Sequence, residues 1–263
     1  MDETTQKDEL ESSKAPFLEH LEELRRRVWY AMVAVLITSI GCWIYREFFF
    51  ELITRPLYDI LKGADETAAM KFRTVAGAFM FQFKTTILGG VFLAMPVLLF
   101  QVWRFVAPGL YSSERKMALP FMFLASICFY CGVTFAYTIA LPVTFEFLMS
   151  YEIGIGSFKL EPDITSEDYF GLFTQGLLVF GILFLMPVIL GFLSAAGFLT
   201  HKDLLKFWRW AVVISFILGA FLSPPDPLTQ FIYAFPMIGL YGLSILVAYL
   251  VAKKGDGEDE EME

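Results

Sequence analysis

Long blocks of consecutive apolar residues constrain this chain more than any other feature of its sequence. A helix needs roughly 20 residues to cross the hydrocarbon core of a membrane, and the blocks predict helices at about residues 28–50, 76–105, 119–142, 169–196, 210–222 and 230–250. Only 18% of the 263 residues are charged and the mean hydropathy is +0.60, values that are unusual for a soluble domain. We therefore expect an all-α integral membrane protein with six transmembrane helices.

Interior prolines are expected to bend three of these helices. Pro96 lies in the second block, Pro187 in the fourth and Pro236 in the sixth, and each removes a backbone hydrogen bond. The bends predict a concave arrangement of helices rather than a straight bundle. The last two helices are expected to be short, because little apolar chain separates Arg209 from the turn at 223–227.

The distribution of lysine and arginine predicts the orientation, because both residues prefer the loops on the cytoplasmic side of a membrane. Of the 20 Lys and Arg residues, thirteen fall on segments of one side and the other seven are Arg46, Arg55, Lys62, Lys71, Arg73, Lys84 and Lys159. The side with thirteen includes both ends of the chain, so both termini are expected in the cytoplasm. No cleavable signal peptide is recognised before the first block, which we expect to be retained.

Acidic residues are concentrated at the two ends of the chain, whose net charge is −8. Residues 1–16 and 253–263 are expected to be disordered acidic tails on the cytoplasmic side. Residues 17–252 are expected to form the membrane domain. The net charge therefore says little about the membrane domain itself.

Motifs typical of enzymes are absent from the sequence. It has no phosphate-binding loop, no HExxH and no GxSxG, and its two histidines, His20 and His201, are far apart. The three cysteines lie in apolar blocks, where small residues that pack between helices are the favoured interpretation and metal or redox chemistry is the alternative. We expect neither catalysis nor a bound cofactor or metal.

An amphipathic segment precedes the first apolar block. Phe17, Leu21, Leu24 and Val28 form one apolar stripe at helical spacing, which is typical of a helix at the membrane surface. On its polar side Glu22 precedes Arg26, and Glu23 precedes Arg27, by four residues. Salt bridges within the helix are the simplest explanation of these charges.

A second polar segment, residues 101–116, follows the second block. Its aromatic residues are typical of a membrane interface, and Pro108-Gly109 ends the helix and leaves Glu114 in a short turn on the cytoplasmic side. Glu114 could pair locally with Arg115 or Lys116. It could instead form a carboxylate pair with Glu23 at the cytoplasmic rim.

Three stretches of the chain resemble the motifs of the TatC family, the multispanning receptor subunit of the twin-arginine translocase. They are HLxELR at 20–25, QxWxFxxPGLxxxE at 101–114 and PPDxxxQ at 224–230. The resemblance implies a protein of the bacterial plasma (inner) membrane that binds twin-arginine signal peptides at its cytoplasmic face. It also implies transport of folded proteins across the membrane, driven by the proton-motive force.

The resemblance further implies roles for particular residues. The carboxylates of Glu23 and Glu114 would meet the paired arginines of a signal peptide. Around that site the resemblance implies roles for Arg25, Arg104 and Phe105, and it implies contacts to partner subunits for Ser223 and Gln230. Further family-motif residues are Pro56, Lys84 and Asp226. The alternative for Asp226 is that it caps the sixth helix. The implied partners are single-span TatA/TatB-like subunits, other copies of the chain and membrane lipid, without nucleic acid.

The sequence departs from the family pattern at two places. Leu185 precedes Pro187 where the family usually has an acidic or amide residue, and Gly242 follows Tyr241 where the family usually has a glutamate. We therefore expect no mechanism that needs a membrane-buried carboxylate at either place. Gln175, about three turns before Leu185, is a candidate for a replacement polar group.

Two other classes of function remain as alternatives. A secondary transporter of a small solute would place ionisable residues near the middle of the membrane, whereas this sequence keeps most of its charges at the rims. A structural scaffold for other membrane proteins would be indifferent to the paired arginines of a signal peptide.

Overall fold

The computed structural model describes residues 3–64, 71–106, 118–150, 153–155, 158–160, 165–223 and 226–260. These residues are almost entirely helical and form six spans long and apolar enough to cross a membrane: Glu19–Ile44, Gly77–Phe105, Pro120–Met149, Ser166–Ala195, His201–Leu222 and Pro227–Leu250. The prediction of an all-α protein with six transmembrane helices is confirmed, apart from one small antiparallel hairpin between β1 (Ile153–Ile155) and β2 (Phe158–Leu160).

The helices follow the chain in a simple order. They are α1 (Glu3–Ile44), α2 (Arg46–Ala64), α3 (Gly77–Val106), α4 (Ala118–Phe135), the π-helical segment η3 (Ala136–Ala140), α5 (Leu141–Met149), α6 (Ser166–Leu183), α7 (Met186–Ala195), α8 (His201–Leu222) and α9 (Pro227–Glu260). Helices α1 and α9 extend into the two segments, 1–16 and 253–263, that were expected to be disordered. The limits of the membrane domain stay a prediction.

Prolines interrupt two of the six crossings. In the third crossing the π-helical segment η3 separates α4 from α5, which has Pro142 in its first turn. In the fourth crossing a short turn separates α6 from α7, which has Pro187 in its first turn. By contrast, Pro96 and Pro236 lie inside the continuous helices α3 and α9.

The last two crossings are the shortest, with 22 and 24 residues against 26 to 30 for the other four. Helix α8 begins at His201, earlier than the sequence predicted. A capping box fixes this start, because the Thr200 side chain accepts a hydrogen bond from the Asp203 amide and the Asp203 carboxylate accepts one from the Thr200 amide. The first turns of α8 were missed because they carry the charged residues Lys202, Lys206 and Arg209 and so do not form an apolar block.

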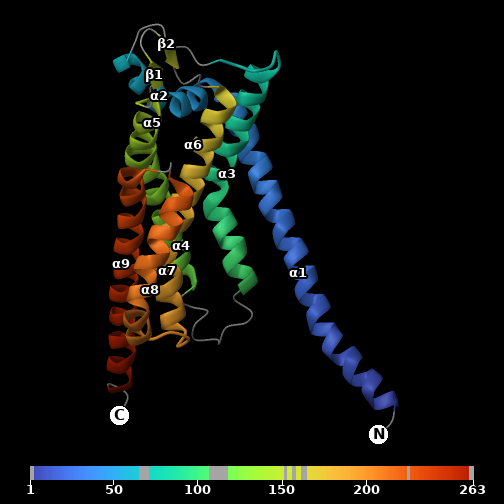
Figure 1. Ribbon diagram of the computed structural model, residues 1–263. Helices are drawn as coiled ribbons and strands as arrows, with labels where there is room; N and C mark the ends of the chain where they lie inside the picture. Colours follow the sequence, from blue (N-terminus) through green and yellow to red (C-terminus); the bar gives the residue numbers. More distant parts are fainter. Residues whose placement is uncertain are drawn as a thin grey trace.

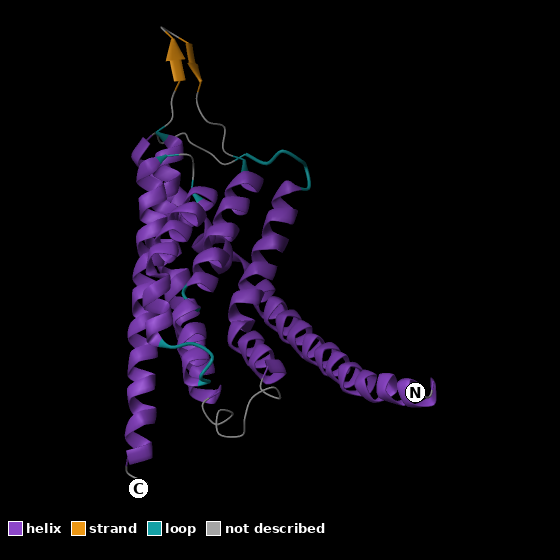
Figure 2. Ribbon diagram, turned by 60° about the horizontal axis from the view of Figure 1, so that its bottom comes forward, coloured by secondary structure: helices purple, strands orange, loops and turns teal. Residues whose placement is uncertain are grey.

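The helices are arranged as an open, concave group (Figure 1). Helix α1 packs along α3, α9 packs against both α7 and α8, and α4 packs against α6. The N and C termini lie at one end of the molecule, as an even number of crossings requires; we call this the terminal end. Helix α2 lies across the opposite end, where the β-hairpin projects beyond the helices (Figure 2).

Aromatic residues form the centre of the main core. Phe173 and Phe180 of α6 are almost fully buried, and the Tyr169 ring contacts the Phe145 ring at a tilt of 30°, with centroids 4.9 Å apart. Leu57 of α2 belongs to the same cluster. The core therefore joins α2 to the crossing helices and fixes the end of the molecule opposite the termini.

Candidate functional site at the terminal end of the first two crossings

Glu23 forms an ion pair within α1. Arg27 Nη2 donates to Glu23 Oε1 at 2.7 Å, and the two side chains are only 10% and 21% exposed. This confirms the salt bridge expected from their spacing of one helical turn. Glu22 was expected to pair with Arg26 but instead lies 3.7 Å from Arg25, in a pair that is 75% exposed on both sides.

A ring contact joins the first two motifs. The His20 ring on α1 stacks on Phe105 of α3, with centroids 4.3 Å apart and an interplanar angle of 21°. Glu23 lies about one helical turn beyond His20, so Glu23 and Phe105 belong to one surface of the α1–α3 pair. Arg104 is exposed, and its guanidinium lies 5.6 Å from the centre of the Phe100 ring.

A hollow with mixed charge follows the polar side of α1. Its volume is about 600 Å³, and it is lined by Glu19, Glu22, Glu23, Arg25, Arg26, Trp29 and Tyr30. Carboxylates and aromatic rings are the groups that bind a guanidinium best, the first through paired hydrogen bonds and the second through the ring face. The arrangement can therefore receive an arginine side chain.

Glu114 lies outside the described residues, which on this side of α3 end at Val106. Arg115 and Lys116, its alternative local partners, lie outside them as well. The meeting of Glu23 and Glu114 at one site stays a prediction. Of the five residues predicted for this site, Glu23, Arg25, Arg104 and Phe105 lie toward the terminal end of α1 and α3.

Among the described residues at this end, two buried polar atoms have no hydrogen-bond partner: Arg27 Nε and Gln101 Oε1. Arg27 is 8% exposed. Sequence reasoning gave neither residue a part in the site, although Gln101 opens the second motif. The unused donor of this buried arginine becomes visible only in the folded structure.

The turn between α8 and α9 holds a second group of predicted residues. Ser223 Oγ is buried without a hydrogen-bond partner, and Gln230 Nε2 donates to the Phe216 carbonyl at 3.1 Å. Asp226 accepts the Thr229 amide proton at 2.8 Å, which matches the expected cap of the last helix. Ser223 lines a cavity of about 270 Å³ that also includes Thr144, Gln175 and Tyr233.

Two of the remaining predicted positions, Pro56 and Lys84, lie toward the end opposite the termini. Pro56 is buried inside α2, and Lys84 is exposed on α3. Leu185 is 8% exposed and packs with Ala125, Phe129 and Val188 in an apolar cluster. Leu185 thus packs among apolar side chains.

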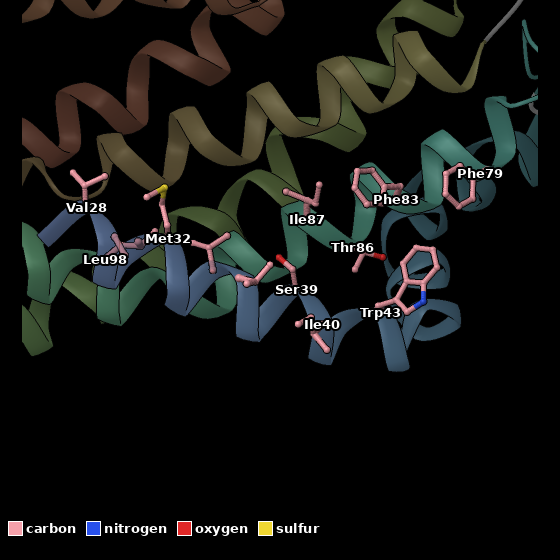
Figure 3. A pocket seen from close by; sticks show the side chains of 13 residues that line it. Val28, Met32, Ser39, Ile40, Trp43, Phe79, Phe83, Thr86, Ile87 and Leu98 are labelled. Carbon is pink, nitrogen blue, oxygen red and sulfur yellow. The ribbon is translucent and has the colours of Figure 1, made fainter. Parts of the chain in front are cut away.

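A wide groove between α1 and α3 is almost entirely apolar (Figure 3). Its volume is about 780 Å³, and its lining includes Met32, Ile40, Trp43, Phe83 and Leu98, with Ser39 and Thr86 as the polar members. The groove offers no charged group to an arginine. The three cysteines are free, and no cluster of His, Cys, Asp or Glu suited to a metal occurs among the residues that the structure describes.

Comparisons with known proteins agree on one family. A family profile described as Sec-independent protein translocase protein (TatC) matches residues 19–236. A TatC protein from Magnetococcus marinus is 36% identical over 241 residues, covering 92% of this chain and 86% of its own length. One from Helicobacter pylori strain J99 is 33% identical over 244 residues, covering 92% of this chain and 93% of its own length.

Solved structures give the same result. Two crystal structures of the twin-arginine translocase receptor TatC, one of them in the detergent DDM, superpose with TM-scores of 0.70 and 0.72 at 32% identity. They cover 89% and 87% of this chain and 99% of their own chains. With six apolar crossings, the chain is a multi-pass protein of the bacterial inner membrane. It belongs to the TatC family of Sec-independent protein translocases.

Proposed function

We propose that this chain is the receptor subunit of a twin-arginine protein translocase and binds the paired arginines of a signal peptide at the terminal end of α1 and α3. The observation that carries the proposal is the position of Glu23, a carboxylate beside the His20–Phe105 stack and in the lining of a hollow that also holds exposed arginines. Glu114 would supply the second carboxylate.

The chemistry of the guanidinium group explains the selectivity for arginine. A carboxylate binds a guanidinium through two parallel hydrogen bonds, whereas the ammonium of lysine is a point charge that cannot reproduce this geometry. Each charge-assisted hydrogen bond contributes about 1.5–3 kcal/mol. The aromatic face of Phe105 would add a contact along the plane of the guanidinium.

The cavity below the α8–α9 turn would receive a partner subunit. Ser223 Oγ is buried without a partner, and the exposed Gln175 lines the same cavity inside an apolar crossing. An apolar helix that carries one polar side chain would pair with these groups, because unpaired polar groups are costly inside a membrane. Single-span TatA/TatB-like subunits fit this description, and together with Gln230 they would complete the complex.

The orientation and the energy source follow from the same proposal. Both termini would lie in the cytoplasm, because the excess of Lys and Arg is on their side. The transport of folded proteins would draw on the proton-motive force, since a membrane potential supplies about 2.3 kcal/mol per charge per 100 mV. The family consists of translocase components and is not known as a family of enzymes.

The test is the binding of a synthetic twin-arginine signal peptide, and of its twin-lysine version, to the purified protein in lipid nanodiscs. The arginine peptide should bind more tightly, and Glu23→Gln and Glu114→Gln should each remove most of the preference. Glu146→Gln serves as a matched control, because Glu146 is an exposed carboxylate on α5 toward the opposite end. Equal binding of both peptides by well-folded protein would contradict the proposal.

A further inference from the structure

The carboxylate proposed to receive an arginine from a signal peptide already holds an arginine of its own chain. Arg27 Nη2 lies 2.7 Å from Glu23 Oε1, and only 10% of the Arg27 side chain is exposed. An incoming guanidinium that binds Glu23 through two hydrogen bonds would compete with Arg27 for the same oxygens. The displaced Arg27 would then need another acceptor, because a buried charge without partners is costly.

Gln101 is positioned to be that acceptor. Thr38 of α1 donates to the Gly90 carbonyl of α3 at 2.7 Å, which fixes the register of these antiparallel helices. About three helical turns toward the terminal end, the same faces carry Arg27 on α1 and Gln101 on α3. The His20–Phe105 stack lies further along the same two faces. This register places Arg27 and Gln101 at the same level of the α1–α3 pair, between two observed contacts.

The unused polar atoms on these two residues are complementary. Arg27 Nε is a buried donor without a partner, and Gln101 Oε1 is a buried acceptor without a partner. Each unsatisfied buried group carries a desolvation cost. A rotation of the Arg27 side chain away from Glu23 and toward Gln101 would satisfy both atoms, and it would free the Glu23 carboxylate.

We propose that Arg27 is an internal competitor for Glu23, and that a signal-peptide arginine displaces it onto Gln101. This inference rests on the proposed function, because it assumes that Glu23 binds the peptide. Arg27 then acts as a specificity residue. A ligand side chain must hold Glu23 at least as well as a guanidinium does, which a lysine ammonium cannot do.

The test is a double-mutant cycle on the affinity for a twin-arginine peptide in nanodiscs, with the natural protein, Arg27→Ala, Gln101→Leu and the double variant. Loss of the competitor should tighten binding by about tenfold, which corresponds to roughly 1.4 kcal/mol and to one charge-assisted hydrogen bond. Gln101→Leu should weaken binding severalfold when Arg27 is present and should have no effect when Arg27 is absent.

A matched control uses the exposed ion pair at the opposite end. Arg73 Nη2 lies 3.1 Å from Asp168 Oδ2 with both side chains more than half exposed, so Arg73→Ala removes an arginine–carboxylate pair and should not alter peptide affinity. If Arg27→Ala does not yield folded protein, Arg27→Lys replaces it in the cycle. Lysine releases Glu23 more easily, so the twin-arginine peptide is again expected to bind more tightly. Replacing the arginines of the peptide by lysine should then cost less affinity than it does in the natural protein.

The outcomes separate this inference from the proposed function. Weaker binding by folded Arg27→Ala or Arg27→Lys, or an equal effect of Gln101→Leu with and without Arg27, would overturn the exchange while leaving Glu23 as the receptor carboxylate. Binding that does not distinguish arginine from lysine peptides in the natural protein would overturn the proposed function, and the exchange with it.

Discussion

The Tyr137 hydroxyl of η3 donates to the Leu52 carbonyl of α2 at 2.8 Å. Leu52 lies four residues before Pro56, which has no amide proton to give to that carbonyl. The same relationship occurs in α3, where the Tyr130 hydroxyl donates at 2.9 Å to the carbonyl of Phe92, four residues before Pro96. In both places a tyrosine from another helix satisfies the backbone group that a proline leaves free.

This arrangement predicts an interaction between Tyr137 and Pro56. Tyr137→Phe should lower the free energy of unfolding by about 0.5–1.5 kcal/mol, the usual contribution of one hydrogen bond. In a Pro56→Ala background the loss should be smaller, because the alanine amide can donate to Leu52 within the helix. Thermal unfolding of the purified variants in detergent measures both values.

The control for this cycle is Tyr45→Phe, since Tyr45 is 68% exposed and should contribute little in either background. An equal loss for Tyr137→Phe with and without Pro56 would mean that the hydroxyl does not compensate for the proline. Tyr130 and Pro96 allow an independent repeat of the cycle in the second crossing.

The contact between α1 and α3 depends on a glycine. A Cβ atom on Gly90 would lie 2.7 Å from Ser39 Cα and 2.8 Å from Ser39 N, so backbone atoms would have to move apart. Gly90→Ala should therefore lower the free energy of unfolding by about 1–3 kcal/mol, the typical cost of overpacking, and should lengthen the Thr38–Gly90 hydrogen bond. Thermal unfolding of the purified protein measures the first effect.

Gly41 provides the matched control in the same helix pair. A Cβ on Gly41 of α1 meets nothing within 4 Å, so Gly41→Ala should leave the stability unchanged or raise it by up to about 1 kcal/mol through the better helix propensity of alanine. Equal stability of the Gly90→Ala and Gly41→Ala proteins would show that α1 and α3 can separate without cost.

The six crossings and the Glu23–Arg27 pair could be predicted from the sequence because both depend on local spacing. Block length predicts a crossing, and a separation of four residues on a helix predicts an ion pair. Of the three interior prolines expected to bend their helices, only Pro187 lies at a break between two helices, whereas Pro96 and Pro236 lie inside continuous ones. The start of α8 could not be found in this way, because a capping box at Thr200 and Asp203 begins the helix in polar residues.

Contacts between distant segments could not be predicted from periodicity. Nothing in the sequence indicates that the Tyr137 hydroxyl would donate to the Leu52 carbonyl. The sequence also does not indicate that Gln101 would lie at the level of Arg27 on the neighbouring helix, because both relationships depend on the register of packed helices. Helical spacing also could not predict whether Glu22 pairs with Arg25 or with Arg26, since separations of three and of four residues both allow an ion pair. The residues of the candidate site were predicted from the resemblance to family motifs, whereas the residues around them were identified only in the structure.

The cap of α9 can be tested directly. The Asp226 carboxylate accepts hydrogen bonds from the Thr229 amide and hydroxyl, and both residues are buried. Asp226→Ala should lower the free energy of unfolding by about 0.5–2 kcal/mol, whereas Asp226→Asn keeps an acceptor and should lose less. A thermal unfolding series of the three proteins checks the order, and an alanine variant as stable as the natural protein would contradict the capping role.

Leu185 allows a test of the expectation that no membrane-buried carboxylate is needed at this place in the fourth crossing. Its side chain is 8% exposed and packs with Ala125, Phe129 and Val188. Leu185→Glu would place a carboxyl group in an apolar cluster inside a membrane crossing, at a cost of about 2.5–3.5 kcal/mol for an ionised acid. The variant should unfold at a lower temperature, while Leu185→Met, which keeps the volume, should differ by less than about 1.5 kcal/mol. Because the apolar residues packed with Leu185 come from α3, α4 and α7 and not from α1, which carries Glu23, the arginine-peptide affinity of the folded fraction should remain unchanged. A Leu185→Glu variant as stable as the natural protein would mean instead that water or a polar partner reaches this cluster. In that case the carboxyl group would be tolerated at residue 185 itself, and Gln175 would not be needed to replace it.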